Sequence, residues 1–247
     1  MSSQKTKDQL AEEKQRAAAA ALTFVRSGMR LGLGSGSTSH AFIRALGERV
    51  RAGALRIEGI ATSKDSEEQA RGFGIPLIQP ARGLRLDLAI DGADEIDPEL
   101  ALIKGGGGAL LREKAVARAS RTFLVIADSS KCVDSLGAFP LPVEVIPFTL
   151  PWVLDELEQL GTTPTQRMNA QRPAEPYFTD QGNYIVDCRC SAIGDARALA
   201  AKLESVPGIA EHGLFIDYAT SAIIADDSEV FVLRPRQERE KFEPPKP

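Results

Sequence analysis

The densest group of side chains that could do chemistry lies in residues 86–114. An apolar run ends in Asp91, and Asp94 follows three residues later. Lys104 then leads into four consecutive glycines, and Glu113 comes five residues after the last of them. Carboxyl groups beside a cation can move protons to and from a substrate. Glycine peptides let backbone N–H groups approach oxygen atoms closely. The spacing therefore predicts an acid–base site next to an anion-binding loop.

A strand, two loops and a helix must position these groups. The aliphatic run before Asp91 is typical of a buried strand that stops at a turn. In open parallel α/β sheets, ligands lie beyond the carboxyl ends of the strands, where Asp91 and Asp94 would stand. Residues 109–114 favour a helix, whose N-terminus would also attract an anion over the glycine loop.

Simpler interpretations exist for each acid alone. A lone Glu113 could be a surface partner of Arg112 or Lys114, and Asx turns with a helix cap would explain Asp91 and Asp94. A metal site is disfavoured, because an EF-hand loop needs oxygen ligands at alternate positions and a glycine at the sixth. As a spaced set after a buried strand, the acids indicate a site, and we expect no metal and no cofactor.

A second loop of small residues, 34–39, lies between a predicted strand at 29–33 and a predicted helix at 40–50. It lacks the third glycine of a dinucleotide fingerprint and the Gly-Lys-Ser/Thr ending of a Walker A loop. Its amides and hydroxyls suit a monophosphate. A Gly/Ser turn without a ligand is the alternative for this loop considered alone.

Composition excludes several classes of protein. The chain has 247 residues, 43% hydrophobic and 26% charged, which is ordinary for a soluble chain with one large or two modest domains. Its net charge is −4 and it has no long Lys/Arg cluster, so we expect no nucleic-acid partner. Three sparse cysteines give no disulfide framework, and the N-terminus has no uninterrupted apolar run. We expect a cytoplasmic protein without a membrane partner.

The order of elements predicts the fold class. Strands and helices alternate through the first half, with a helix at 8–25 capped by Asp8, strands at 56–61, 76–78 and 122–127, and a helix at 66–73. This predicts a parallel sheet covered on both faces. After Gly137 we expect a strand at 139–147, a helix at 152–160, a hairpin at 177–188 turning at 180–183, and a helix at 196–205. Strands at 214–218, 221–225 and 229–233 follow, some returning to the first sheet, and 234–247 is expected to fray.

The predicted architecture is thus α/β, with a parallel-sheet Rossmann-like main domain and a second, smaller α+β domain inserted near the C-terminus. The α/β catalytic domain would comprise 1–137 and 213–247. The small domain, 138–212, would be a lid or an assembly surface.

Several segments resemble the type A ribose-5-phosphate isomerases. DGADEID at 91–97, KGGGGALLREK at 104–114 and GSGSTS at 34–39 are similar to three family signatures. ADSSK at 127–131, FPLPVEVIPF at 139–148 and TDQGNYIVD at 179–187 follow in the family's order. The resemblance implies interconversion of D-ribose 5-phosphate and D-ribulose 5-phosphate through a cis-enediol(ate), in the non-oxidative pentose phosphate pathway, without metal or nucleotide. It also implies a homodimer or homotetramer.

The resemblance implies roles for individual residues. Glu113 matches the general base, Asp91 and Asp94 match acids that open the ring and handle hydroxyl protons, and Lys104 matches the lysine at the polarised oxygen. The matching substrate-binding positions are Ser35, Gly36, Ser37, Thr38, Gly92, Ala93, Gly105, Gly106, Gly107 and Lys131. Lys14 aligns with a lysine of the N-terminal helix in some members. His40 and His212 lie outside the signatures and are interpreted as structural.

The sequence departs from the family pattern at two places, and two other functions are alternatives to the isomerase. Ser35 stands where many members have threonine, and residues 216–221 depart from the family pattern, which leaves the C-terminal strand pairing and the assembly open. A non-catalytic sugar-phosphate sensor would use the same sheet and loops, but it predicts a helix-turn-helix or a lost base. An acyl-CoA transferase would use a glutamate as nucleophile. The sequence favours the isomerase.

Overall fold

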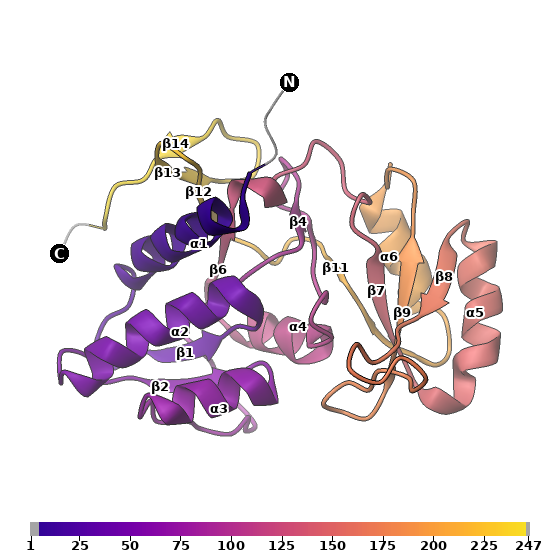
Figure 1. The fold of residues 1–247 in the computed structure, drawn as a ribbon, viewed down its shortest axis with the longest axis horizontal. Coiled ribbons are helices and arrows are strands. Elements are labelled where there is room, and N and C mark those ends of the chain that lie inside the picture. Colours follow the sequence, from indigo (N-terminus) through magenta and orange to yellow (C-terminus); the bar gives the residue numbers. More distant parts are fainter. Residues whose placement is uncertain (1–4, 246–247) are drawn as a thin grey trace.

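The computed structural model describes residues 5–245, which form one large sheet, two smaller sheets and the helices around them (Figure 1). The large sheet has the strand order β14-β13-β12-β6-β3-β1-β2. Its strands are β1 (Arg30–Leu33), β2 (Glu58–Ala61), β3 (Leu88–Asp91), β6 (Phe123–Asp128), β12 (Ser221–Ala225), β13 (Val230–Leu233) and β14 (Glu240–Lys241). The five strands from β2 to β12 are parallel, and β13 and β14 add an antiparallel edge.

Helices cover both faces of the large sheet, as predicted. They are α1 (Lys7–Leu22), α2 (Gly36–Arg51), α3 (Lys64–Gly72) and α4 (Leu110–Ala119). Successive strand residues point to opposite faces. On one face Ile90 and Ile126 share a core with α1, α2 and α3, and on the other Val125 packs with Val116 and Ala117 of α4.

Two helix starts differ from the prediction. Thr6, not Asp8, caps α1, because its hydroxyl accepts from the Gln9 backbone N–H in a capping box, and Asp8 lies in the first turn. Helix α2 begins at Gly36 instead of His40, so most of the predicted loop is its first turn. Tertiary contacts outweigh the weak helix propensity of these small residues, since the Ser39 hydroxyl is buried and donates to Asp91.

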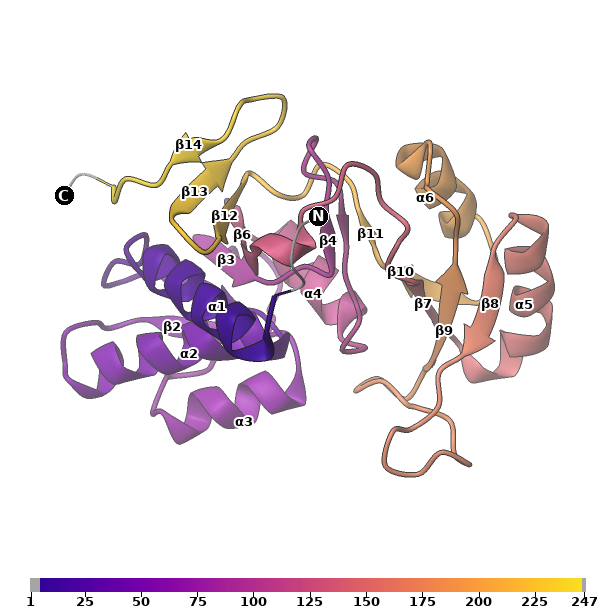
Figure 2. The same ribbon diagram turned by 45° about the horizontal axis from the view of Figure 1, so that its top comes forward.

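A four-stranded antiparallel sheet, with the order β10-β7-β9-β8, is formed by residues 141–212. Its elements are β7 (Leu141–Val145), η2 (Pro147–Thr149), α5 (Leu150–Gln159), β8 (Thr163–Gln166), β9 (Tyr184–Arg189), α6 (Ala196–Glu204) and β10 (Ile209–His212). Figure 2 shows α5 and α6 along one side of this sheet, where they share one apolar core with it.

The predicted hairpin at 177–188 is only partly right. A turn at Thr179–Asn183 carries a single bridge between Phe178 and Tyr184, whereas β9 pairs along its length with β7 and β8. Strand β8 was not predicted because its sequence, Thr-Pro-Thr-Gln, has no apolar alternation. A proline is tolerated there since β8 is an edge strand.

Short elements connect the two main sheets. Strands β4 (Glu95–Ile96), β5 (Leu102–Ile103) and β11 (Leu214–Phe215) form a three-stranded sheet, and the 3-10 turn η1 (Ser129–Lys131) follows β6. The predicted strand at 76–78 is only one bridge, Gly59 to Leu77.

The prediction of a frayed tail is wrong in part. Strand β14 pairs with β13, and the Phe242 ring lies 6.2 Å from that of Phe24, so apolar contact holds this segment. Residues 246–247 lie outside the described chain. Within 5–245, none of the helices combines the length and the apolarity needed to cross a membrane.

Candidate active site

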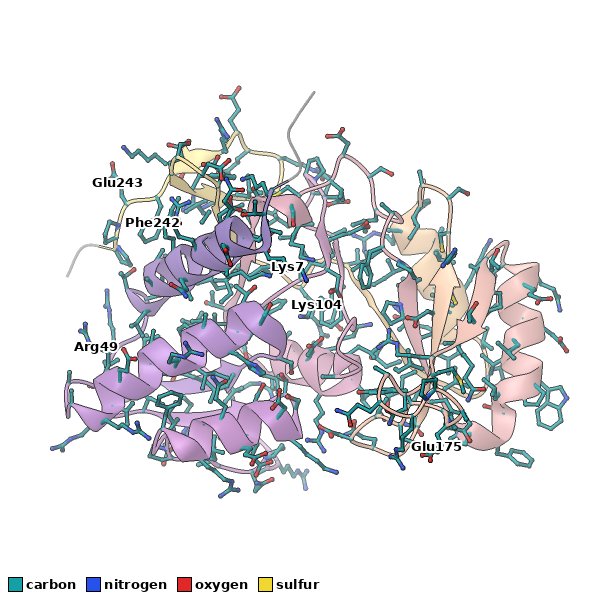
Figure 3. All side chains as sticks on the ribbon, in the orientation of Figure 1. Lys7, Arg49, Lys104, Glu175, Phe242 and Glu243 are labelled. Carbon is teal, nitrogen blue, oxygen red and sulfur yellow. The ribbon has the colours of Figure 1, made fainter. Side chains whose placement is uncertain are left out.

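Lys104 is the centre of a buried cluster of charges. Its Nζ lies 3.2 Å from Asp91 Oδ2 and 3.4 Å from Glu113 Oε2, and it donates to the Gly92 carbonyl at 2.5 Å. Figure 3 shows Lys104 between the two main parts of the molecule, where β5 ends. The backbone N–H of Lys104 donates to the Gly213 carbonyl, which fixes the start of the glycine loop. Strand pairing therefore brings the cation to the end of β3.

Asp91, the last residue of β3, is held by several donors. Its Oδ1 accepts from the Ser35 backbone N–H at 2.9 Å, the Ser39 hydroxyl at 3.0 Å and the Gly92 N–H at 2.7 Å. A side chain at position 34 would overlap the Asp91 carboxyl group, which explains the glycine there. Because both oxygens are engaged and only 3% of the residue is exposed, the Asp91 carboxyl group is held in a fixed position beside Lys104.

Asp94 anchors the glycine loop. Its Oδ2 accepts from the Gly106 backbone N–H at 2.8 Å. Gly105 and Gly108 have φ values of +101° and +78°, which other residue types rarely adopt, so this turn requires glycine. The loop thus follows Lys104 closely and leads into α4.

Glu113, in the first turn of α4, is only 5% exposed. Burial raises its pKa to about 8, with Lys104 opposing this shift and the Asp91 and Asp94 carboxylates adding to it. For Lys104, burial lowers the pKa, but the attraction of Asp91, Glu113 and Asp94 outweighs it and the pKa is raised. A cation thus lies beside a carboxyl group able to exchange a proton near neutral pH.

The surface interpretation of Glu113 is wrong. Its neighbours in sequence face other groups, since Arg112 lies 3.5 Å from Asp180 and Lys114 donates to Glu211 at 2.5 Å. Helix geometry places consecutive residues on different faces, so Glu113 points to Lys104 while the other two point away.

A cavity of about 120 Å³ opens at the carboxyl ends of the strands. Its lining includes all ten predicted substrate-binding residues and three of the four predicted catalytic ones. The lining residues are Lys14, Ser35, Gly36, Ser37, Thr38, Gly92, Ala93, Asp94, Lys104, Gly105, Gly106, Gly107, Glu113 and Lys131. Asp91 is not among the described residues that line the cavity; its carboxyl group contacts Lys104, Ser35 and Ser39.

One side of the cavity suits an anion. Ser35 is the N-cap of α2 and makes no side-chain capping bond, so the amides of the first turn are left for another acceptor. Lys14 from α1 and Lys131 from η1 line the same cavity. Lys104 and Glu113 line this cavity as well. An anionic group bound at α2 would therefore share the cavity with the groups that can move protons.

The sequence did not reveal several supporting residues. Ser39 lies in the GSGSTS segment, and its position there is the only signal for its bond to Asp91. The Phe215 ring lies 5.6 Å from Lys104 Nζ, and Arg167 and Tyr177 contact the glycine loop. They belong to no motif near the predicted site. Within residues 5–245, no three His, Cys, Asp or Glu side chains gather as metal ligands would.

Fold and site together define a class of protein: an α/β enzyme that moves protons on a small anionic substrate.

Comparisons with known proteins identify the family. Residues 58–229 match the family model of ribose 5-phosphate isomerase A, also called phosphoriboisomerase A. Ribose-5-phosphate isomerase A of Parvibaculum lavamentivorans is 49% identical over 220 residues, covering 87% of this chain and 95% of the relative. The Bartonella quintana enzyme of the same name is 51% identical over 228 residues, covering 89% and 95%.

A solved D-ribose-5-phosphate isomerase in complex with phospho-erythronic acid has a TM-score of 0.88 and 37% identity, covering 91% of this chain and 99% of the other. The chain belongs to the ribose-5-phosphate isomerase A family and is an isomerase that interconverts ribose 5-phosphate and ribulose 5-phosphate. The resemblance predicted from the three motifs is confirmed. The sensor and transferase alternatives are not supported.

Proposed function

We propose that the isomerisation proceeds through a cis-enediolate and that Glu113 carries the proton between C1 and C2. The observation that supports this most is the burial of Glu113 beside Lys104, with a pKa raised to about 8. A base with a pKa near neutrality can both remove a proton next to a carbonyl and return it. The Lys104 ammonium, 3.4 Å away, would stabilise the oxyanion that develops.

The two aspartates have different roles in this scheme. Asp94 lines the cavity, so it can exchange protons with the sugar hydroxyls and open the ring. Asp91 has its oxygens occupied and does not line the cavity in the described chain, so it acts by holding Lys104 charged and in place. The steps use only side chains of this protein.

The phosphate group would lie at the N-terminus of α2. The first turn of α2 supplies backbone amides, and Ser37, Thr38, Lys14 and Lys131 line the same cavity. Ser35 is also hydrogen-bonded to Thr62 Oγ1 at 2.5 Å, which steadies the loop. The relative solved with phospho-erythronic acid binds a phosphorylated sugar acid, which supports a phosphate site in this family.

We also propose the larger organisation implied by the family. Residues 1–137 with 213–247 would be the catalytic domain, and 138–212 the smaller one. The chain would act in the cytoplasm, within the non-oxidative pentose phosphate pathway, as a homodimer or homotetramer. Three free cysteines fit a reducing compartment.

The test is conversion of ribose 5-phosphate in deuterated water with EDTA present. Wild type should incorporate solvent deuterium, and Glu113→Gln should lower kcat by about 10²- to 10⁴-fold. Glu99→Gln, an exposed glutamate of the same stretch, is the matched control and should behave as wild type. Undiminished turnover in Glu113→Gln would show that another group is the base.

A further inference from the structure

The carbonyls of three consecutive loop glycines accept hydrogen bonds from the antiparallel sheet region. Arg167 Nη1 donates to the Gly105 carbonyl at 3.2 Å and to the Gly106 carbonyl at 2.9 Å. Tyr177 Oη donates to the Gly107 carbonyl at 3.0 Å. Arg167 and Tyr177 are more than fifty residues from the loop in sequence. Together they fix the direction of three peptide groups that line the cavity.

Arg167 is itself held in one orientation. It follows β8 directly, and its Nε donates to Asp187 Oδ2 at 2.8 Å while Nη2 donates to Oδ1. This bidentate pairing with a residue of β9 leaves Nη1 for the loop. The guanidinium lies 5.7 Å from the Tyr177 ring, and the Tyr177 backbone N–H donates to the Arg167 carbonyl. The arginine side chain is only 16% exposed, so its position is well defined.

The loop is held from the opposite side by a predicted catalytic residue. Asp94 accepts from the Gly106 N–H, so the Gly106 peptide group and its neighbour are bound between Asp94 and Arg167. A Cβ at Gly106 would come within 2.7 Å of Asp94 Oδ1 and 3.0 Å of the Phe139 ring. Movement of the loop would therefore displace Asp94 and the adjacent Lys104.

We propose that Arg167, oriented by Asp187, is a positioning residue for the isomerisation. This rests on the function proposed above. In this proposal the antiparallel sheet contributes to catalysis, because Arg167 keeps the glycine-loop amides and Asp94 in the geometry that the reaction needs. Arg167 touches the loop and not the reacting atoms, and a displacement of about 1 Å can lower a rate by about 100-fold. The effect should appear in kcat more than in KM, because Arg167 contacts the glycine loop, whereas the phosphate is proposed to bind at the N-terminus of α2.

The experiment compares wild type with Arg167→Lys, Arg167→Met and Asp187→Asn. We expect kcat for Arg167→Met to fall about 10- to 100-fold while KM changes by less than about threefold. Arg167→Lys should fall between wild type and Arg167→Met, because an ammonium keeps the charge but not the planar fork. Asp187→Asn should lower kcat in the same direction, and combining it with Arg167→Met should add little. Arg172→Met, which removes an exposed arginine of the same segment, is the control.

The kinetic isotope effect with 2-deuterated ribose 5-phosphate separates positioning from folding. If Arg167 positions the loop, the isotope effect on kcat should rise as proton transfer becomes slower. If Arg167 only stabilises the fold, the active fraction will fall with the melting temperature while KM and the isotope effect stay at wild-type values, and the inference is overturned. The inference is also overturned if wild type is active and the Arg167 and Asp187 variants have the same kcat as wild type. An inactive wild type would overturn the proposed reaction and this inference with it.

Discussion

Glu113 and Lys104 share one buried site, and each charge depends on the other. Burial favours the neutral carboxyl group, and the ammonium favours the carboxylate. Removing the Glu113 charge leaves Lys104 paired with Asp91, 3.2 Å away, so the lysine keeps a partner. The free energy of unfolding should therefore change with pH as Glu113 loses its proton.

Glu113→Gln should make the protein more stable than wild type at alkaline pH. The folded pKa is raised to about 8 from an ordinary 4.5, so this group supports folding fully below pH 4.5 and the support is lost as pH rises through about 8. Between pH 4.5 and about 8, the free energy of unfolding of Glu113→Gln should rise relative to that of wild type by on the order of 1 kcal/mol per pH unit. Thermal unfolding from pH 5 to 9 measures it. A stability difference that is constant with pH would contradict the assigned pKa.

At this scale the sequence predicted most of the site. Asp94, Lys104 and Glu113 stand in two short motifs, and the strand end and glycine loop were recognisable from local pattern. The bonds that fix Asp91 were not recognisable, because they join the end of β3 to Ser35 and Ser39 at the start of α2, which are distant in sequence. Arg167 was missed for the same reason, since its contact to the loop joins distant parts of the chain.

The elements position the site through close backbone approach, and Gly34 shows this most clearly. It lies after β1, where its N–H donates to the Ile90 carbonyl of β3. A side chain there would overlap the Asp91 carboxyl group and Cα. The two strand ends can be this close only with glycine at that position.

Gly34→Ala should therefore lower both stability and kcat. Separating β1 from β3 costs about 1 to 3 kcal/mol, as other forms of overpacking do, and it moves Asp91 away from Lys104. Gly72→Ala, at the end of α3 with open space around it, should be neutral or stabilising by up to about 1 kcal/mol. Urea denaturation and steady-state kinetics on both variants are the measurements. Wild-type behaviour of Gly34→Ala would show that the strand ends can separate without loss.

Element prediction succeeded where apolar periodicity was strong and failed for short or polar segments. The buried strands β3, β6 and β12 were predicted, whereas the polar edge strand β8 was missed. Strand β10 was also missed, since it follows a proline–glycine turn and ends in Glu211 and His212. Their pairing is set by the neighbouring strands, which single-sequence patterns do not contain.

At the scale of the whole molecule, the antiparallel region exposes large apolar side chains. Phe148 and Trp152 are 80% and 60% exposed, and their rings contact each other at 5.6 Å. Aromatic side chains on a surface are enriched at interfaces. These two residues are candidates for the interface of the homo-oligomer proposed above.

Phe148→Ser combined with Trp152→Ser should weaken self-association. Losing two aromatic anchors removes apolar area that an interface would bury, so the double variant should dissociate at protein concentrations where wild type remains assembled. Sedimentation velocity over a dilution series measures this, and Trp152→Phe should retain assembly. An identical sedimentation coefficient for the double variant and wild type at every concentration would place the interface elsewhere.

The pairing of β12 with β6 inside the large sheet has a consequence for how the protein is made. This strand, at 221–225, lies between β6 and β13, and α1 packs against it. During synthesis β1, β2, β3 and β6 leave the ribosome well before β12, so β6 keeps an open hydrogen-bonding edge until residues 221–225 have emerged. A chain that stalls shortly before residue 221 contains every side chain of the catalytic cluster and still cannot complete its sheet. Such a chain exposes the unpaired hydrogen-bonding edge of β6, to which another strand could pair.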